Sequence, residues 1–83
     1  MSNKVSYVTK EGLKKLQEEL ERLQNVERPK ISKAIGEAIE KGDISENAEY
    51  DAAKDAQGLL EAKIAQLKDT IATCRVIDES QID

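Results

Sequence analysis

The side chains best suited to chemistry in this sequence are carboxylates that lie close together near its middle. Asp43, Glu46, Glu49 and Asp51 fall within the stretch GDISENAEYD, residues 42–51. Carboxylate oxygens are good ligands for Mg²⁺, which demands a near-octahedral shell. A few carboxylates on a short loop cannot build that shell alone, but they can complete the shell of an ion that another molecule holds. The stretch therefore predicts acidic groups that act at the metal site of a partner.

The same acids also have a structural interpretation, which stays open. Asp43 and Glu46 have the spacing of a capping box, in which two side chains satisfy free amides at a helix start. The helix dipole favours acids there as well. Capping accounts for only part of the cluster, however. A calcium-binding loop fits poorly, because Ala48 and Lys54 stand where a glycine and a bidentate glutamate are required.

Two helices are expected to position these acids. Apolar residues recur every three or four positions over residues 10–41 and again over residues 46–74. The connection at residues 42–45 is short, so the helices must run antiparallel. The predicted fold class is all-α, an antiparallel two-helix hairpin or intramolecular coiled coil with an acidic tip at residues 42–50. Each helix thus has an apolar stripe along one side. The stripe of the first helix contains Leu13, Leu16, Leu20, Leu23, Ile31, Ile35 and Ile39, and that of the second contains Ala52, Ala56, Leu60, Ile64, Leu67, Ile71 and Cys74.

Local features refine this hairpin. Thr9 is expected to cap the first helix, with Glu11 in its first turn. Pro29 lacks an amide hydrogen and crowds the carbonyl four residues earlier, which predicts a kink or a short interruption near residues 25–29. Alanines on both sides of the tip would let the helices approach closely and give a narrow end; they are Ala34, Ala38, Ala48, Ala52, Ala53 and Ala56.

Composition excludes several classes of function. The chain has 83 residues, of which 39% are hydrophobic, and a net charge of -4. The small hydrophobic share suits one elongated domain. The negative net charge argues against sequence-independent binding to nucleic acid. No histidine is present and no nucleophile motif is recognisable, so a self-contained enzyme is not expected. The lone Cys74, the lack of a signal segment and the lack of a long apolar run predict a reduced, cytoplasmic protein without membrane contact.

Three segments together resemble a known family. They are VTKEGLKKLQEELERL, RPKISKAIGEAIEK and GDISENAEYDAAKDAQGLLEAKI. Over residues 8–78 the sequence resembles the N-terminal coiled-coil domain of the GreA family of bacterial transcript cleavage factors. The resemblance implies a hairpin that enters the secondary channel of bacterial RNA polymerase and stimulates the polymerase's own cleavage of backtracked nascent RNA. The chain would then be no enzyme itself. The isolated domain would bind no cofactor, and Mg²⁺ would be shared with the polymerase active site.

The resemblance also assigns roles to single residues. Asp43 and Glu46 match the acids that would help hold the second Mg²⁺ and orient the attacking water. Supporting tip residues would be Asn47, Glu49 and Tyr50.

A basic face toward the RNA 3′ end is implied in the same way. Lys54 matches one of its positions, and Lys41 is the candidate to substitute for an arginine at the position of Ile39. Ile39 itself is expected to pack inward, continuing from Ile35.

The predicted organisation has three parts. An extended lead at residues 1–9 precedes the hairpin at 10–74, and residues 75–83, with the strand-like Val76 and Ile77, form a linker toward an absent C-terminal FKBP-like domain. A monomer is expected, because an intramolecular hairpin needs no partner. Two alternatives are a channel-binding inhibitor of polymerase and a structural coiled coil without chemistry.

Overall fold

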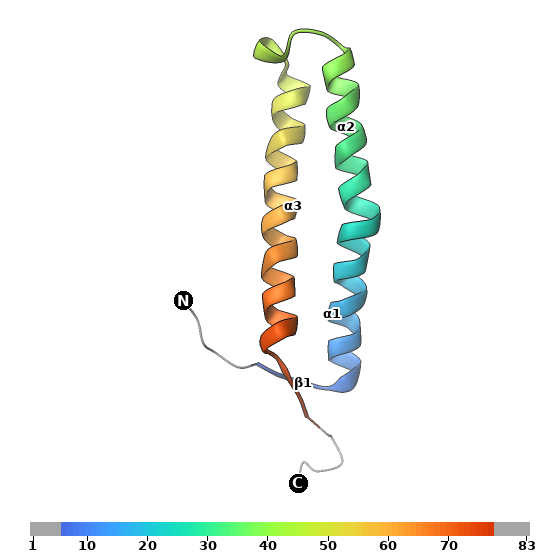
Figure 1. Ribbon diagram of the computed structural model, residues 1–83, viewed down its shortest axis with the longest axis vertical. Coiled ribbons are helices and arrows are strands. Elements are labelled where there is room, and N and C mark those ends of the chain that lie inside the picture. Colours follow the sequence, from blue (N-terminus) through green and yellow to red (C-terminus); the bar gives the residue numbers. More distant parts are fainter. Residues whose placement is uncertain (1–5, 78–83) are drawn as a thin grey trace.

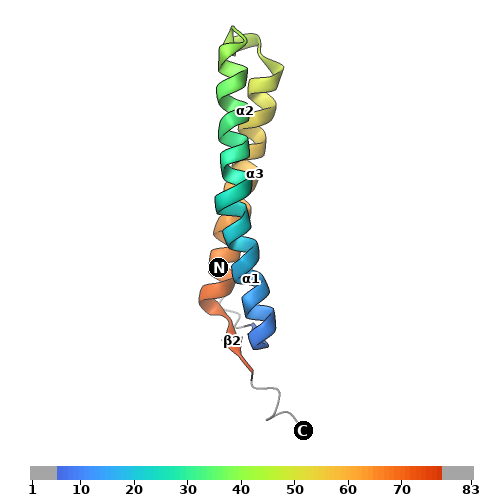
Figure 2. The same cartoon turned by 90° about the vertical axis from the view of Figure 1, so that its right-hand side faces the viewer.

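The computed structural model describes residues 6–77, which form two antiparallel helical arms (Figure 1). The first arm runs through α1 (Lys10–Arg22), the π-helical segment η1 (Leu23–Glu27) and α2 (Arg28–Glu40). A loop with a short 3₁₀ turn, η2 (Ile44–Glu46), leads into the second arm, α3 (Ala48–Thr73). The molecule measures 62 × 26 × 14 Å, and the side view shows the arms lying one behind the other along the whole rod (Figure 2). The predicted hairpin is confirmed.

The first helix begins where its capping residue predicts. Thr9 has extended backbone angles, and its Oγ1 accepts a hydrogen bond of 3.0 Å from the amide of Gly12. Glu11 lies in the first turn, where its charge complements the helix dipole.

The expected interruption before Pro29 takes the form of a widened helical turn. Residues 23–27 are π-helical, and the amide of Arg28 donates to the carbonyl of Leu23, five residues back. Pro29 has no amide hydrogen and would crowd the carbonyl of Asn25 in a regular α-helix, and a wider turn relieves that contact. The chain remains helical throughout residues 10–40. The structure therefore does not confirm a kink at Pro29.

A small apolar core holds the arms together at mid-length. Leu23, Leu60 and Ile64 are buried, and partly buried Leu20, Ile31 and Leu67 pack around them. Closer to the tip the buried residues are Ala38 and Ala53. The alanine pattern is confirmed at these two positions, whereas Ala34, Ala48 and Ala52 are exposed.

The predicted stripes are wrong at two positions near the tip. Ile39 is 46% exposed, because its neighbour Ala38 takes the inward position. Ala52 is exposed and Ala53 is buried in its place. Successive residues on a helix point about 100° apart, so only one of two neighbours can face the other arm. Leu59 is 75% exposed for the same reason, since the adjacent Leu60 is buried.

An ion pair between the arms lies beside the core. Arg28 Nε and Nη2 donate to Glu61 Oε2 and Oε1 at 2.9 and 2.7 Å. A two-bond arginine–carboxylate contact constrains geometry more strongly than a single bond does. It therefore helps to fix how far one arm lies along the other.

The two ends of the hairpin meet at the base of the rod. Strand β1 (Tyr7–Val8) pairs in parallel with β2 (Arg75–Val76), a feature that the all-α prediction did not include. The amide of Arg75 donates to Ser6 at 2.8 Å, and that of Ile77 donates to Val8 at 2.7 Å. The remaining parts of the predicted lead and linker, residues 1–5 and 78–83, lie outside the described residues. Over residues 6–77, no helix has the length and apolarity to cross a membrane.

Candidate functional site

The chain reverses at the far end of the rod through the tip loop, residues 41–47 (Figure 1). Helix α2 closes with the amides of Lys41 and Gly42, which donate to the carbonyls of Ala38 and Ile39 at 3.2 and 3.3 Å. Gly42 then adopts a φ of 138°, a conformation that residues with a Cβ rarely adopt. This glycine is what allows the loop to leave the helix axis immediately.

Asp43 stabilises the loop itself and not the start of the long second helix. Its Oδ1 accepts from the backbone amide of Ser45 at 3.0 Å and from the Ser45 hydroxyl at 2.7 Å. Asp43 thereby caps the 3₁₀ turn η2. These two hydrogen bonds lower the pKa of Asp43 below its usual value, and the bond from the hydroxyl has the larger effect. Both bonds use the same carboxylate oxygen, and among the described residues no donor reaches Oδ2.

The capping box predicted for Asp43 and Glu46 is wrong, because the residue that caps α3 is Asn47. Asn47 Oδ1 accepts from the amide of Tyr50 at 3.0 Å. Its Nδ2 donates to the carbonyl of Ala38, in the last turn of α2, at 2.6 Å. Asparagine is among the best N-cap residues, and this one directly precedes an apolar-periodic run. That signal is present in the sequence, but the competing Asp43 spacing hides it.

An open depression at the tip brings together most of the predicted site residues. It is lined by Lys41, Asp43, Glu46, Asn47, Ala48 and Glu49. The carboxylates of Asp43 and Glu46 come from either end of the 3₁₀ turn, and both residues are exposed. The acids most directly implicated by the resemblance therefore lie on one surface that a partner can reach.

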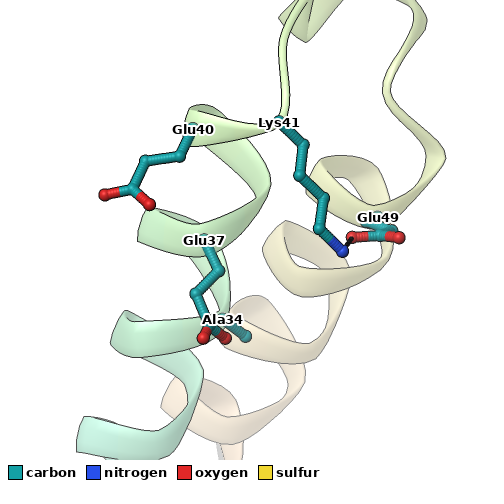
Figure 3. Close-up of a pocket in the computed structure, with 5 residues that line it drawn as sticks. All are labelled: Ala34, Glu37, Glu40, Lys41 and Glu49. Carbon is teal, nitrogen blue, oxygen red and sulfur yellow. Dashed lines mark hydrogen bonds and ion pairs between the residues drawn. The ribbon is translucent and has the colours of Figure 1, made fainter.

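Lys41 and Glu49 form an ion pair across the tip that the sequence did not suggest. Lys41 Nζ lies 2.8 Å from Glu49 Oε2, and this contact raises the pKa of Lys41. Figure 3 shows the lysine reaching from the end of α2 toward the glutamate on α3. Glu37 and Glu40 extend from α2 and line a neighbouring cavity together with Ala34 and the ion pair. The positive charge of Lys41 is thus paired with the carboxylate of Glu49.

The remaining predicted residues lie outside the depression. Lys54 Nζ donates to Gln57 Oε1 at 3.0 Å, within α3. Tyr50 is half-buried in the first turn of the same helix. Neither is among the residues that line the depression.

The tip offers few ligands for a metal ion of its own. Over the part of the chain that the structure describes, no group of three or more His, Cys, Asp or Glu residues is arranged to hold one. The depression instead carries the exposed carboxylates of Asp43, Glu46 and Glu49, of which Glu49 is paired with Lys41, and Oδ2 of Asp43 accepts no protein hydrogen bond within residues 6–77. Such a set fits an ion whose other ligands come from a partner, because Mg²⁺ is commonly bound through one or two carboxylates.

Comparison with known proteins places this hairpin in a family. A sequence model described as "Transcription elongation factor, N-terminal", for GreA and GreB, matches residues 6–76. Transcription elongation factor GreA of Christiangramia forsetii is 68% identical over 81 residues, which cover 98% of this chain and 51% of the relative. The Flavobacterium johnsoniae factor is 63% identical, with the same shares covered. The Mycoplasma pneumoniae factor is 53% identical over 76 residues, which are 92% of this chain and 48% of the relative.

The chain thus spans about half the length of the curated relatives that it matches. The matched residues 6–76 include both arms, the tip loop and the paired strands at the base. The chain belongs to the family of GreA and GreB transcription elongation factors, of which it represents the N-terminal hairpin.

Proposed function

We propose that this chain is the arm of a transcript cleavage factor that enters bacterial RNA polymerase and delivers Asp43 and Glu46 to the catalytic centre of the elongation complex. Membership of the GreA and GreB family supports the partner. The observation that carries the proposal is the placing of two exposed carboxylates in one depression at the end of a narrow rod 62 Å long. A partner with a deep, narrow channel can receive such an end.

The chemistry then belongs to the polymerase and not to this chain. A Mg²⁺ ion in the polymerase site would activate water and stabilise the charge that develops on the phosphate oxygens. Asp43 and Glu46 would supply carboxylate ligands and orient the attacking water. The chain acts as a stimulator in trans, without a cofactor of its own, in the bacterial cytoplasm and as a monomer.

The nascent RNA 3′ end would meet the basic residues beside the tip. Lys41 has Glu49 as its partner, and Lys54 has Gln57. Both contacts are exposed, so phosphate oxygens can replace them at small cost. With a net charge of -4, the attraction toward RNA is confined to these local groups.

The experiment is RNA cleavage in stalled, backtracked bacterial elongation complexes with Mg²⁺ and excess protein. The parent chain should shorten the RNA, and Asp43→Asn should reduce the cleavage rate at least about 100-fold, the typical size of a lost catalytic electrostatic contact. Asp55→Asn is the matched control, since Asp55 is an exposed acid on α3 outside the depression.

Equal cleavage by the parent and Asp43→Asn would refute the proposed role of the carboxylate. If the parent chain did not shorten the RNA but still displaced an intact cleavage factor from the complex, it would be a channel-binding inhibitor. If it did neither, the hairpin would be a structural element without this chemistry.

A further inference from the structure

We propose that Asn47 is the positioning residue of the tip: its side-chain amide fixes the loop that presents Asp43 and Glu46. This inference rests on the proposed function, because it concerns how the same two carboxylates are held. Asn47 touches neither reacting atoms nor metal in this account, and it acts through the backbone around it.

The carboxamide of Asn47 joins the two arms with both of its polar atoms. Oδ1 accepts from the amide of Tyr50 in the first turn of α3, and Nδ2 donates to the carbonyl of Ala38 in the last turn of α2. Ala38 is 1% exposed, so the carbonyl belongs to a buried residue where the arms touch. One side chain therefore satisfies a free amide at the start of α3 and gives a second donor to a carbonyl at the end of α2, which also accepts from the amide of Lys41 at 3.2 Å.

The backbone hydrogen bonds within the 3₁₀ turn η2 are longer. The amides of Glu46 and Asn47 donate to the carbonyls of Asp43 and Ile44 at 3.3 and 3.4 Å. Both distances exceed the usual range of about 2.7–3.2 Å for such bonds. The bond from Asn47 to Ala38, at 2.6 Å, is much shorter. Asn47 therefore ties the end of the loop back to α2 through a short hydrogen bond, and the directions of the Asp43 and Glu46 side chains depend on the loop.

Chemistry explains why this position suits an asparagine. A carboxamide carries a donor and an acceptor at the same distance from the backbone, whereas a carboxylate can only accept. Aspartate would cap α3 equally well, but its second oxygen would face the Ala38 carbonyl without a hydrogen to share. Serine would also cap the helix, although its shorter side chain could not reach across to Ala38. Both substitutions therefore remove the tether and keep the cap.

The test compares the parent with Asn47→Asp and Asn47→Ser in two measurements. The first is amide hydrogen exchange followed by NMR, which needs no polymerase. Exchange at Ser45 and Glu46 should become about tenfold faster in both variants, the factor expected from one lost hydrogen bond, while the amides of α3 beyond its first turn stay unchanged. The serine variant adds no charge, so it separates the lost donor from the effect of an extra acid.

The second measurement is the RNA cleavage rate as a function of protein concentration. Both variants should lower the maximal rate about tenfold, while the concentration that gives half of that rate stays within about twofold of the parent value. A role in folding or docking alone would instead raise the half-saturating concentration and leave the maximal rate unchanged. Normal exchange at Ser45 and Glu46, or a normal maximal rate, would overturn the inference while the parent remains active. An inactive parent would overturn the proposed function. The exchange rates would then decide by themselves whether Asn47 tethers the loop.

Discussion

At the residue scale, one oxygen of the Asp43 carboxylate has a structural role and the other is left available to a ligand. Oδ1 holds the loop through both donors of Ser45, and among the described residues Oδ2 has no donor. The bonds that lower its pKa also keep Asp43 ionised, which is the form in which a carboxylate binds a metal ion. A short loop can thus orient one acid through its neighbours and still leave an oxygen for a ligand.

Gly42 is the second residue on which the tip depends, and its substitution has a predicted sign. Gly42→Ala should reduce the free energy of unfolding by about 1–3 kcal/mol, because alanine is strained at a φ of 138°. Gly36→Ala is the matched control within α2, where an added Cβ meets no atom within 4 Å. It should raise the free energy of unfolding by roughly 0.5–1 kcal/mol. Urea unfolding followed by circular dichroism measures both, and a stabilising Gly42→Ala would contradict the loop conformation described above.

At the element scale, most of the hairpin could be predicted from the sequence. The three- and four-residue spacing of the apolar residues predicts two helices, and at mid-length it also predicts the facing residues Leu20, Leu23, Leu60 and Ile64. Near the tip the inward residue does not follow from the sequence, because Ala38 and Ile39 are both apolar and spacing does not decide which one faces the other arm. The π-helical turn at residues 23–27 adds to this uncertainty, since it shifts the phase of every later residue in the first arm.

The site was predictable to a smaller extent than the fold. The acids of the tip follow from residue type and position in the hairpin, whereas their partners do not. The contact between Lys41 and Glu49 links the two arms, and so does the bond from Asn47 to Ala38. Such contacts depend on how one arm lies along the other, and local spacing carries no information about that alignment.

Two adjacent leucines of α3 test the packing of the arms. Leu60 is 8% exposed and contacts the core, while Leu59 is 75% exposed. Leu60→Ala should reduce the free energy of unfolding by about 2–5 kcal/mol, since it leaves a cavity between the arms. Leu59→Ala should change it by less than about 0.5 kcal/mol. Equal effects of the two substitutions in urea unfolding would show that α3 faces the first arm differently from the structure.

The ion pair between the arms predicts a pH dependence. The hydrogen bonds from Arg28 lower the pKa of Glu61 below its ordinary value. The pair therefore stabilises the fold above the ordinary glutamate pKa, and this contribution is lost as the pH falls through the lowered value. Arg28→Gln should reduce the melting temperature slightly at neutral pH and should make no difference in stronger acid. Lys33→Gln, which removes an exposed cation from the same helix, is the control and should show no such convergence.

At the scale of the whole molecule, the paired strands that close the hairpin lie at one end of the rod and the exposed carboxylates of the tip loop lie at the other. The paired strands β1 and β2 close the base, the apolar core fixes the middle, and the tip loop lies at the opposite end of the rod (Figure 1). Little side-chain volume is needed near the tip, where Ala38 and Ala53 are the buried residues. The buried side chains near the tip are therefore smaller than the leucines and the isoleucine of the core at mid-length.

Under the proposed function, the tip carboxylates provide ligands for a metal ion of the partner polymerase. The most direct test measures RNA cleavage in backtracked complexes over a series of Mg²⁺ concentrations, with saturating parent chain, Asp43→Asn or Asp55→Asn. Asp43→Asn should raise the Mg²⁺ concentration needed for half-maximal cleavage about tenfold or more, because a ligand has been lost, and Asp55→Asn should match the parent. A reduced cleavage rate with an unchanged Mg²⁺ requirement would contradict this role, and Asp43 would then act on the RNA or on the shape of the loop.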